Sequence, residues 1–231
     1  MTLIAMLLLR PRNKINSKAS FILGGREEIF QAKSEEDYSR RDFTGRIIYQ
    51  ITEVLLFNGG VGRSWIDYDQ RKDDQSFLWD VGFIYQTGPR WKAEFMFKQD
   101  DPHSVDDGLS NRKRVEASFS YLERLPTKVE FYAEKQKFQT KDLEDRKIGG
   151  NVAISFPFRN RFNLDLSGGV TAYRFLPEEE NVFRYDVGVS AGYRLKMGLL
   201  SGGYRYEFRD SDLDVNEYQN NRLFIQYSIQ I

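Results

Sequence analysis

The stretch Asn181–Leu195, NVFRYDVGVSAGYRL, decides the fold because its residues alternate in polarity along its whole length. One alternating set is apolar and the other is charged or small. The apolar set is Phe183, Tyr185, Val187, Val189, Ala191, Tyr193 and Leu195, and the polar set is Arg184, Asp186, Gly188, Ser190, Gly192 and Arg194. A period of two predicts a β-strand with two unlike faces.

The apolar face of this strand has an internal order, with aromatic rings at both ends and small aliphatic side chains between them. In a strand that crosses a bilayer, aromatic rings settle at the two interfaces and aliphatic side chains face the acyl chains. The stretch therefore predicts a membrane-spanning strand whose charged and small residues line an aqueous lumen.

Composition narrows the class of protein. The chain has 231 residues, which suffices for one large β domain or one barrel. Its 34 basic and 34 acidic residues balance, so the charge indicates no nucleic-acid partner. The absence of cysteine excludes disulfides, thiolate metal sites and cysteine nucleophiles. No apolar run approaches the roughly 18 residues of a membrane-spanning helix.

The chain divides into an N-terminal segment, residues 1–18, and a predicted barrel domain, residues 19–231. The segment opens with an apolar run, Met1–Leu9, which Arg10 and Pro11 end. No basic region precedes this run. We interpret the segment as a signal-peptide remnant, a misplaced start or a fragment boundary, and a short buried strand is the alternative.

The alternation recurs along the rest of the chain and predicts twelve strands. They are expected at residues 19–31, 45–57, 61–69, 76–86, 91–98, 114–121, 128–134, 147–156, 161–170, 181–195, 200–209 and 222–231. A tight turn is expected at Asn58-Gly59-Gly60, because Asn and Gly accept positive φ. The connections are expected to alternate between long and short.

A soluble β-sandwich or soluble barrel would also alternate, with its apolar face inward. Three features favour a membrane barrel. All of the predicted strands exceed the usual globular length of about 5–6 residues, and nine of the twelve are long enough for the roughly 9–11 residues that cross a bilayer. Long and short connections alternate, and the strand count is even. We therefore predict an all-β fold, a transmembrane antiparallel up-and-down β-barrel of about twelve strands.

The closing segment supports a resemblance. Tyr204–Asp212, Tyr218 and Asn221–Tyr227 resemble the last hairpin of Gram-negative outer-membrane β-barrels, in the style of porins and of barrels associated with exopolysaccharide export. Such barrels usually end on an aromatic residue, whereas this chain ends on Ile231 with Tyr227 four residues earlier. The resemblance implies an outer-membrane location and an oligosaccharide channel, a lipid-modifying enzyme or a secretion pore, without choosing among them.

Residues for enzymatic catalysis are scarce. The one histidine, His103, lies beside Ser104 in a predicted loop, where nothing orients the pair as nucleophile and base. The His–Ser pattern of envelope lipases and deacylases has no match. Glu130 and Glu134 are expected to pair with Lys128 and Arg114 rather than act as acid and base. We predict no catalytic residue, no enzymatic activity and no cofactor.

Charge is distributed unevenly, with acidic connections and strands that lean basic. The residues predicted to line the pore are Arg114, Arg184, Arg194, Arg205, Lys92, Glu94, Glu116, Glu130, Asp186 and Glu207. Those predicted to face lipid are Trp79, Phe83, Tyr85, Phe183, Tyr185, Val187, Val189 and Tyr193. Acidic connections solubilise a protein or bind divalent cations, for which the candidates are Asp106, Asp107, Asp210, Asp212 and Asp214.

These observations predict a porin-like channel that passes small solutes or oligo- and polysaccharide and mildly prefers anions. A structural or anchoring barrel with a plugged lumen, within an envelope assembly or a polysaccharide-export complex, is the alternative. Expected partners are outer-membrane lipid and lipopolysaccharide, reached through divalent cations, the barrel assembly machinery and periplasmic export proteins.

Overall fold

The structure is a computed structural model that describes residues 12–14, 18–30, 38–69, 73–101, 103–104, 108–138, 143–158, 161–177, 180–213 and 217–229. The chain divides into two compact units. Unit 1 comprises Met1–Tyr85, Phe95–Val115 and Gln136–Leu143, and unit 2 comprises Gln86–Glu94, Glu116–Lys135 and Glu144–Ile231. Within the described ranges, no helix has the length and apolar character needed to span a membrane.

The described residues form twelve long strands, as the alternation predicts. They are β2 (Ala19–Phe30), β3 (Tyr38–Gln50), β4 (Leu55–Tyr68), β5 (Asp74–Thr87), β6 (Trp91–Asp100), β8 (Gly108–Tyr121), β9 (Thr127–Phe138), β10 (Glu144–Phe158), β11 (Phe162–Leu176), β12 (Glu180–Leu195), β13 (Gly198–Ser211) and β14 (Tyr218–Ile229). Two short strands, β1 (Arg12–Lys14) and β7 (His103–Ser104), accompany them.

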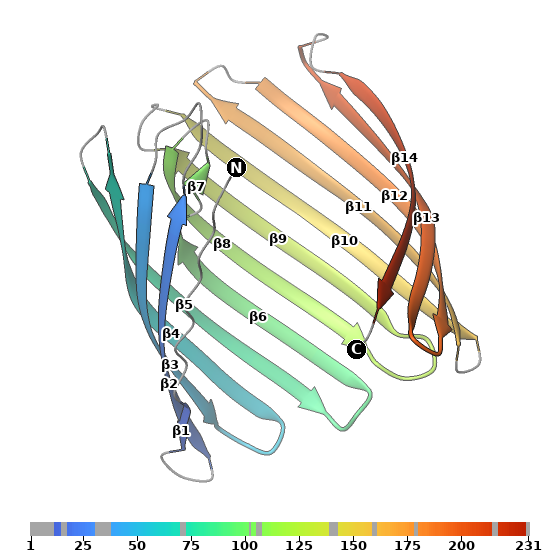
Figure 1. Cartoon of the computed structure of the whole chain (residues 1–231), viewed down its shortest axis with the longest axis horizontal. Helices are drawn as coiled ribbons and strands as arrows, with labels where there is room; N and C mark the ends of the chain where they lie inside the picture. Colours follow the sequence, from blue (N-terminus) through green and yellow to red (C-terminus); the bar gives the residue numbers. More distant parts are fainter. Residues whose placement is uncertain are drawn as a thin grey trace. The chain divides into compact units, whose positions relative to one another are not determined.

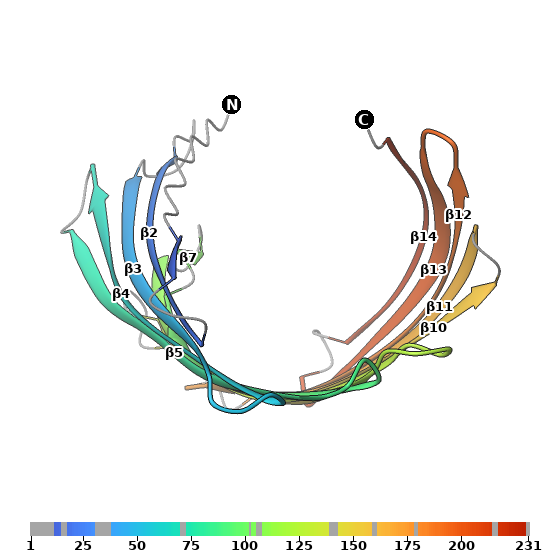
Figure 2. The same cartoon turned by 90° about the horizontal axis from the view of Figure 1, so that it is seen from below.

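Hydrogen-bonded strand order follows the order of the sequence, and β7 pairs with β8 off this path. In unit 1, β1 to β5 pair antiparallel, each with the next. In unit 2, β10 to β14 do the same and lie side by side (Figure 1). Figure 2 shows β10 to β14 bending together as one curved sheet. The arrangement is the predicted antiparallel up-and-down topology.

The predicted turn at Asn58-Gly59-Gly60 is wrong, because these three residues lie inside β4. The chain turns at 51–54 instead, where the Thr52 hydroxyl accepts hydrogen bonds from the backbone N–H groups of Val54 and Leu55 at 3.3 and 3.0 Å. Gly59 and Gly60 do not have the positive φ that a tight turn would require. Gly60 instead lets side chains of β3 and β5 meet above it, as described below.

This error also displaced the second predicted strand. It was expected at residues 45–57, whereas β3 spans Tyr38–Gln50. Residues 38–43 therefore belong to a strand and not to a polar connection. The misplacement arose because Arg40, Arg41 and Asp42 resemble a charged loop in sequence. In the structure the guanidinium of Arg40 donates to Asp42 at 2.8 Å, so the charges are paired on the strand.

Connection lengths alternate less strictly than predicted. Residues 51–54, 88–90, 122–126, 159–161 and 196–197 join strands at one end, and residues 31–37, 69–73, 101–107, 139–143, 177–179 and 212–217 join them at the other. The second group is longer on the whole, but 177–179 is shorter than 122–126. Strands extend into several predicted loops, which shortens the long connections.

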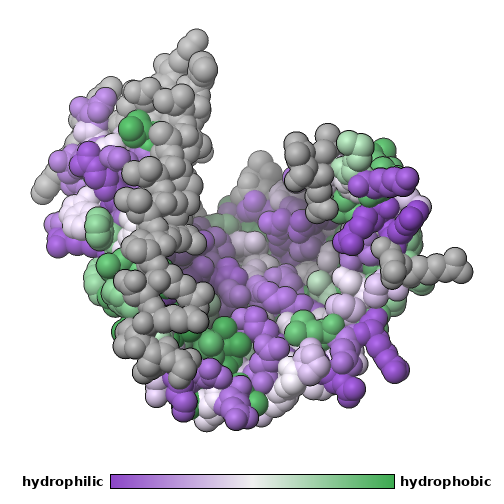
Figure 3. Space-filling view, turned by 60° about the horizontal axis from the view of Figure 1, so that its bottom comes forward, coloured by the Kyte–Doolittle hydropathy of each residue, from purple (hydrophilic) through white to green (hydrophobic). Residues whose placement is uncertain are grey.

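The apolar face of the strands points outward. Val187 is 61% exposed, and Leu223 and Ile225 on β14 are each 80% exposed. Most of the other positions hold polar or small residues, and Figure 3 shows hydrophilic residues gathered on one face of the strands. The N-terminal segment predicted at 1–18 is described only at 12–14 and 18, and Arg12 of β1 lies opposite Ile22 of β2.

Candidate pore-lining surface

Strands β12 to β14 carry a dense set of charges on the polar face. Five arginines and three carboxylates share this face: Arg184, Arg194, Arg205, Arg209, Arg222, Glu180, Asp186 and Glu207. Alternation places them there, since each has the parity opposite to the exposed apolar side chains. The surplus of arginine gives this part of the polar face a positive balance.

The strand register places like charges directly opposite each other. Arg184 faces Arg209, and Asp186 faces Glu207, across β12 and β13. Directly opposed like charges destabilise a sheet, but long side chains reach their diagonal neighbours. The guanidinium of Arg184 accordingly donates to Glu207 at 2.6 Å, and that of Arg205 donates to Asp186 at 3.1 Å. Diagonal bonds thus cancel the repulsion that the register creates.

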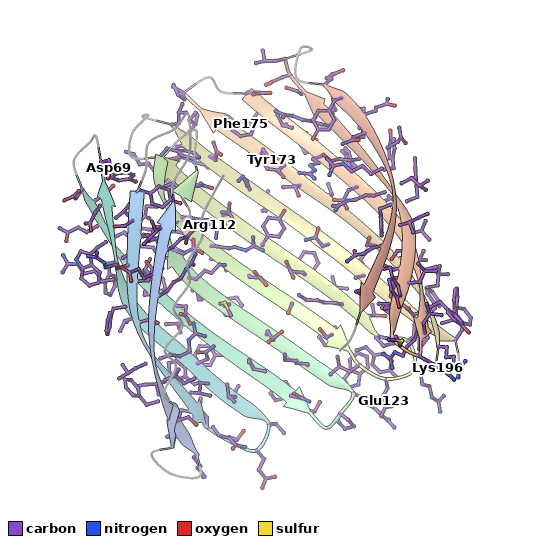
Figure 4. All side chains as sticks on the ribbon, viewed as in Figure 1. Asp69, Arg112, Glu123, Tyr173, Phe175 and Lys196 are labelled. Atoms are coloured by element: carbon purple, nitrogen blue, oxygen red, sulfur yellow. The ribbon has the colours of Figure 1, made fainter. Side chains whose placement is uncertain are left out.

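An aromatic cluster surrounds the end of this array. Tyr173 and Phe175 of β11 lie on one face with their rings stacked at a centroid distance of 6.0 Å (Figure 4). The guanidinium of Arg209 lies 6.0 Å from the ring of Phe175 and 5.9 Å from the ring of Tyr218. The Tyr218 hydroxyl also donates to Glu207. Arginines held over aromatic rings lie along the sheet surface.

Glycines on the polar face let side chains two strands apart make contact. The Tyr132 hydroxyl on β9 and the Thr171 hydroxyl on β11 lie 2.7 Å apart, above Gly149 of β10. A Cβ atom at Gly149 would lie 2.7 Å from the Tyr132 oxygen, so only glycine leaves room for this contact. Such contacts hold polar side chains flat against the sheet.

In unit 1 a glycine likewise lets side chains of two non-adjacent strands, β3 and β5, make contact above the strand between them, β4. Arg46, Gly60 and Asp80 are register partners, and the guanidinium of Arg46 donates across Gly60 to Asp80 at 2.7 Å. A Cβ atom at Gly60 would lie 2.6 Å from the same carboxylate oxygen of Asp80. The glycine therefore makes this ion pair possible.

Arg40 and Arg112 form three further ion pairs in unit 1, two of them with the adjacent aspartates Asp100 and Asp101. Arg40 bonds to Asp101 at 2.7 Å and also reaches Asp42, and both carboxylates are buried. Arg112, labelled in Figure 4, binds both oxygens of Asp100 at 2.7 Å each. Ile66, which is 0% exposed, packs with Tyr38 and Tyr68 as the apolar cluster on this face.

The ten residues predicted to line a pore all lie on the polar face of their strands. Lys92 contacts Glu94 at 2.8 Å, and Ser118 donates to Glu94 at 3.5 Å. Lys128 contacts Glu130 at 2.6 Å, so the predicted pairing of Glu130 with Lys128 is present. Arg184, Arg205, Asp186 and Glu207 come together on β12 and β13, whereas Arg194 is exposed at the other end of β12. Their role in a pore stays a prediction.

The residues predicted to face lipid share the outward face. Seven of the eight are exposed, and Trp79 is half-buried with its indole N–H donating to Gln99 at 3.2 Å. Aromatic contacts also occur on this face near the 88–90 and 122–126 connections, where Trp91 stacks on Phe119 at 5.1 Å. Contact of this face with lipid stays a prediction.

The candidate cation ligands are dispersed. Asp106, Asp107 and Asp214 lie outside the described residues. Asp212 accepts two hydrogen bonds from Asn181, each 3.0 Å long, and Asp210 is exposed. The residues that the structure describes contain no group of three or more His, Asp or Glu that would hold a metal ion. His103 and Ser104 are described as backbone of β7.

The pore residues predicted from the sequence omit Arg46, Asp80 and Arg209. Alternation places all three on the polar face, so the sequence pattern could have identified them as candidates. Their partners depend on the strand register, which the sequence pattern does not supply. Arg40 and Asp42 were missed for another reason, because the segment that holds them was predicted to be a connection.

No protein-family model and no curated protein sequence matches this chain. Solved structures do match its fold. OmpT, an outer membrane protein of Vibrio cholerae folded in vitro, aligns with a TM-score of 0.59 and 9% identity over 96% of this chain and 88% of that chain. The FrpB iron transporter from Neisseria meningitidis (F3-3 variant) aligns with a TM-score of 0.62 and 10% identity over 93% of this chain and 45% of that chain.

A second structure of Vibrio cholerae OmpT, expressed in the outer membrane, gives a TM-score of 0.54 at 9% identity over 87% of this chain and 77% of that chain. At these identities the similarity concerns the fold. It confirms the predicted fold class, because the neighbours are outer-membrane β-barrel proteins, and the predicted outer-membrane location agrees with them. This chain therefore has the fold of the Gram-negative outer-membrane β-barrels.

Proposed function

We propose that this protein is an outer-membrane channel that passes small solutes or oligo- and polysaccharide through its barrel, without chemical turnover and with a mild preference for anions. The observation that carries the proposal is the surplus of arginine on the polar face of β12, β13 and β14. In a barrel this face lines the lumen, and low-dielectric walls focus the field of its charges on a passing ion.

The arrangement of the polar side chains supports passage over a plugged lumen. Arg46 reaches across Gly60, and Tyr132 reaches across Gly149, so both side chains lie along the sheet. Barrels of about 8 strands are filled by side chains, and those of 16–18 leave a channel. At twelve strands the outcome depends on whether side chains lie flat, and these contacts favour free space at the centre.

A structural or anchoring barrel with a plugged lumen is the competing function. The diagonal ion pairs of β12 and β13 favour this structural function, because arginines and carboxylates that are already paired with each other attract a passing solute less. Partners in this proposal are outer-membrane lipid and lipopolysaccharide on the apolar face, and the barrel assembly machinery during insertion. Export proteins of the periplasm would join only if a polymer is carried.

Conductance in planar lipid bilayers tests the proposal. The purified, refolded protein should produce discrete current steps, and a potassium chloride gradient should give a reversal potential of the sign for chloride. Absence of conductance would favour the structural barrel. Conductance with a reversal potential of the opposite sign would keep the channel and reject its anion preference.

A further inference from the structure

The outward face of unit 2 carries three cations at one end of the neighbouring strands β9, β10 and β11. These rim cations are Lys135 on β9, Arg146 on β10 and Arg174 on β11. All three are exposed and in phase with the exposed apolar side chains of their strands. They lie at the end that holds the longer connections, which are extracellular in outer-membrane barrels. The rim cations therefore belong to the outer leaflet.

The uncharged stretch beside the two arginines has the length of a bilayer crossing. Residues 148–158 of β10 and residues 162–172 of β11 carry no charge on the outward face. A tilted strand needs roughly 9–11 residues to cross a bilayer, and each of these stretches is that long. Arg146 and Arg174 occupy the next outward positions on their strands. They are thereby placed at the level of the lipid headgroups.

One carboxylate lies among the rim cations. Glu144 contacts Lys135 at 2.8 Å and accepts a hydrogen bond from Arg146 at 2.7 Å, and no other acidic residue lies on the outward face of the described parts of β9, β10 and β11. The outward face of β12 carries no charge, so Asp210 of β13 is two strand spacings from β11, about 10 Å away. Asp212 is already bonded to β12. These three strands thus have a surplus of positive charge.

The register places two of the rim cations directly opposite each other, because Arg146 and Arg174 are partners across β10 and β11. Directly opposed like charges destabilise a sheet. On the polar face of β12 and β13 the opposed arginines each reach a different glutamate. Here Arg146 shares Glu144 with Lys135. A phosphate group beside the two guanidinium groups would accept paired hydrogen bonds from both and remove their repulsion.

Exposed apolar side chains continue the same surface toward the middle of the strands. Phe131 on β9 and Ile148 on β10 are each 64% exposed, and Val170 on β11 is 45% exposed. Cations at headgroup level beside apolar side chains match an amphiphile with an anionic headgroup. The rim cations span two strand spacings, about 10 Å, which is wider than one phosphate group. A lipid with two phosphates therefore fits this surface better than a phospholipid with one.

We propose that the rim cations bind the phosphorylated headgroup of lipid A, the lipid part of lipopolysaccharide, while its acyl chains lie against the apolar side chains of β9, β10 and β11. The contact is direct and needs no divalent cation, unlike the contact expected from the acidic connections. The inference rests on the proposed function for its lipid partner, and it does not require passage of a solute.

Native mass spectrometry of the refolded protein in detergent, with EDTA present, tests this site with bisphosphorylated lipid A as the probe. Dephosphorylated lipid A and phosphatidylglycerol should each bind about tenfold more weakly or worse, as expected for the loss of charged hydrogen bonds. Loss of lipid A binding in EDTA would assign the contact to divalent cations. Equal binding of phosphatidylglycerol would assign it to phospholipid, and equal binding of dephosphorylated lipid A to the acyl chains. Each of these three results would overturn the inference.

Variants locate the site. Replacing Arg146 and Arg174 together by glutamine should weaken lipid A binding at least about tenfold. A heat-dependent shift in gel mobility verifies folding, and Lys135→Gln, which leaves both arginines in place, should weaken binding several-fold and provides the test if the double variant does not fold. Binding like that of the unaltered protein in the folded variants would reject the site.

Arg41→Gln is the matched control. Arg41 is an exposed outward arginine of β3 at the same end of the strands, but its guanidinium already lies between Glu27 and Asp67, at 3.1 and 3.5 Å. Its replacement should leave lipid A binding unchanged, and a loss equal to that of the double variant would reduce the inference to general charge attraction and overturn it. Conductance without lipid A binding rejects only the rim site, and lipid A binding without conductance rejects only the channel.

Discussion

Arg184 and Glu207 lie diagonally across β12 and β13, and the guanidinium of Arg184 donates to the carboxylate at 2.6 Å. Neither residue is the register partner of the other, since Arg184 lies opposite Arg209 and Glu207 lies opposite Asp186. The diagonal bond converts two repulsive pairs into one attractive contact. Glu207 accepts from both Arg184 and Tyr218, so the stability of this part of the polar face depends on its carboxylate.

Substituting Glu207 tests this dependence. Glu207→Ala should lower the free energy of unfolding by about 1–3 kcal/mol, because Arg184 and the Tyr218 hydroxyl both lose their acceptor and the arginines Arg184 and Arg209 remain opposed. Asp210→Asn at an exposed position should change it by less than about 0.5 kcal/mol. Urea unfolding in lipid vesicles measures both, and equal effects would deny Glu207 this role.

Gly60 offers a test of the contact across β4. Gly60→Ala should displace the Asp80 carboxylate and break its bond to Arg46, because the added Cβ would lie 2.6 Å from Oδ1. Gly45→Ala is the matched control, since its Cβ would make only ordinary contacts at 3.7 Å or more. We expect a loss of about 1 kcal/mol for the first variant and less for the second. Equal losses would show that the ion pair is not the cause.

The two faces of β12 can be separated by placing arginine on each. Val187→Arg should impair folding into vesicles, because arginine at the bilayer midplane of a barrel costs about 2–4 kcal/mol. Ser190→Arg lies three positions on, has the opposite parity and stands between Asp165 of β11 and Gly203 of β13, so its guanidinium has a carboxylate within reach on the polar face. It should fold nearly as well as the unaltered protein. Equally poor folding of both variants would mean that the faces are assigned wrongly.

The anion preference should depend on the arginine surplus of β12 to β14. Replacing Arg184 and Arg205 together by serine leaves three arginines against three carboxylates on this face, so the reversal potential should move toward that of a non-selective channel. In salt near 1 M the difference should disappear, because the screening length falls to about 3 Å. An unchanged reversal potential at 0.1 M salt would place selectivity elsewhere.

Location and closure of the barrel have a simple assay. The protein should fractionate with outer membranes and migrate faster on gels before heating than after, because a folded barrel resists detergent. Its apolar outward face, with Leu223 and Ile225 each 80% exposed, would otherwise be solvated by water. A soluble monomer without a mobility shift would contradict the membrane location.

The sequence by itself determined the fold class and the number of long strands, and along Asn181–Leu195 it separated the two faces. Side chains alternate strictly along a strand, so polarity alone places Val187 and Arg184 on opposite faces, wherever the strand pairs. Along Asn181–Leu195 the alternation of apolar with polar or small residues is long and regular, so the assignment of each residue to one of the two faces is clear. The same reasoning failed at Asn58-Gly59-Gly60, because glycine serves both turns and close contacts between side chains.

Only the tertiary structure decided which charges meet. Register sets Arg184 diagonal to Glu207 and aligns Arg46, Gly60 and Asp80 in one row, and register depends on how three neighbouring strands pair together. No local pattern in the sequence encodes a contact between side chains two strands apart. The bond from Arg46 to Asp80 follows from that row, because glycine at position 60 leaves no side chain between them.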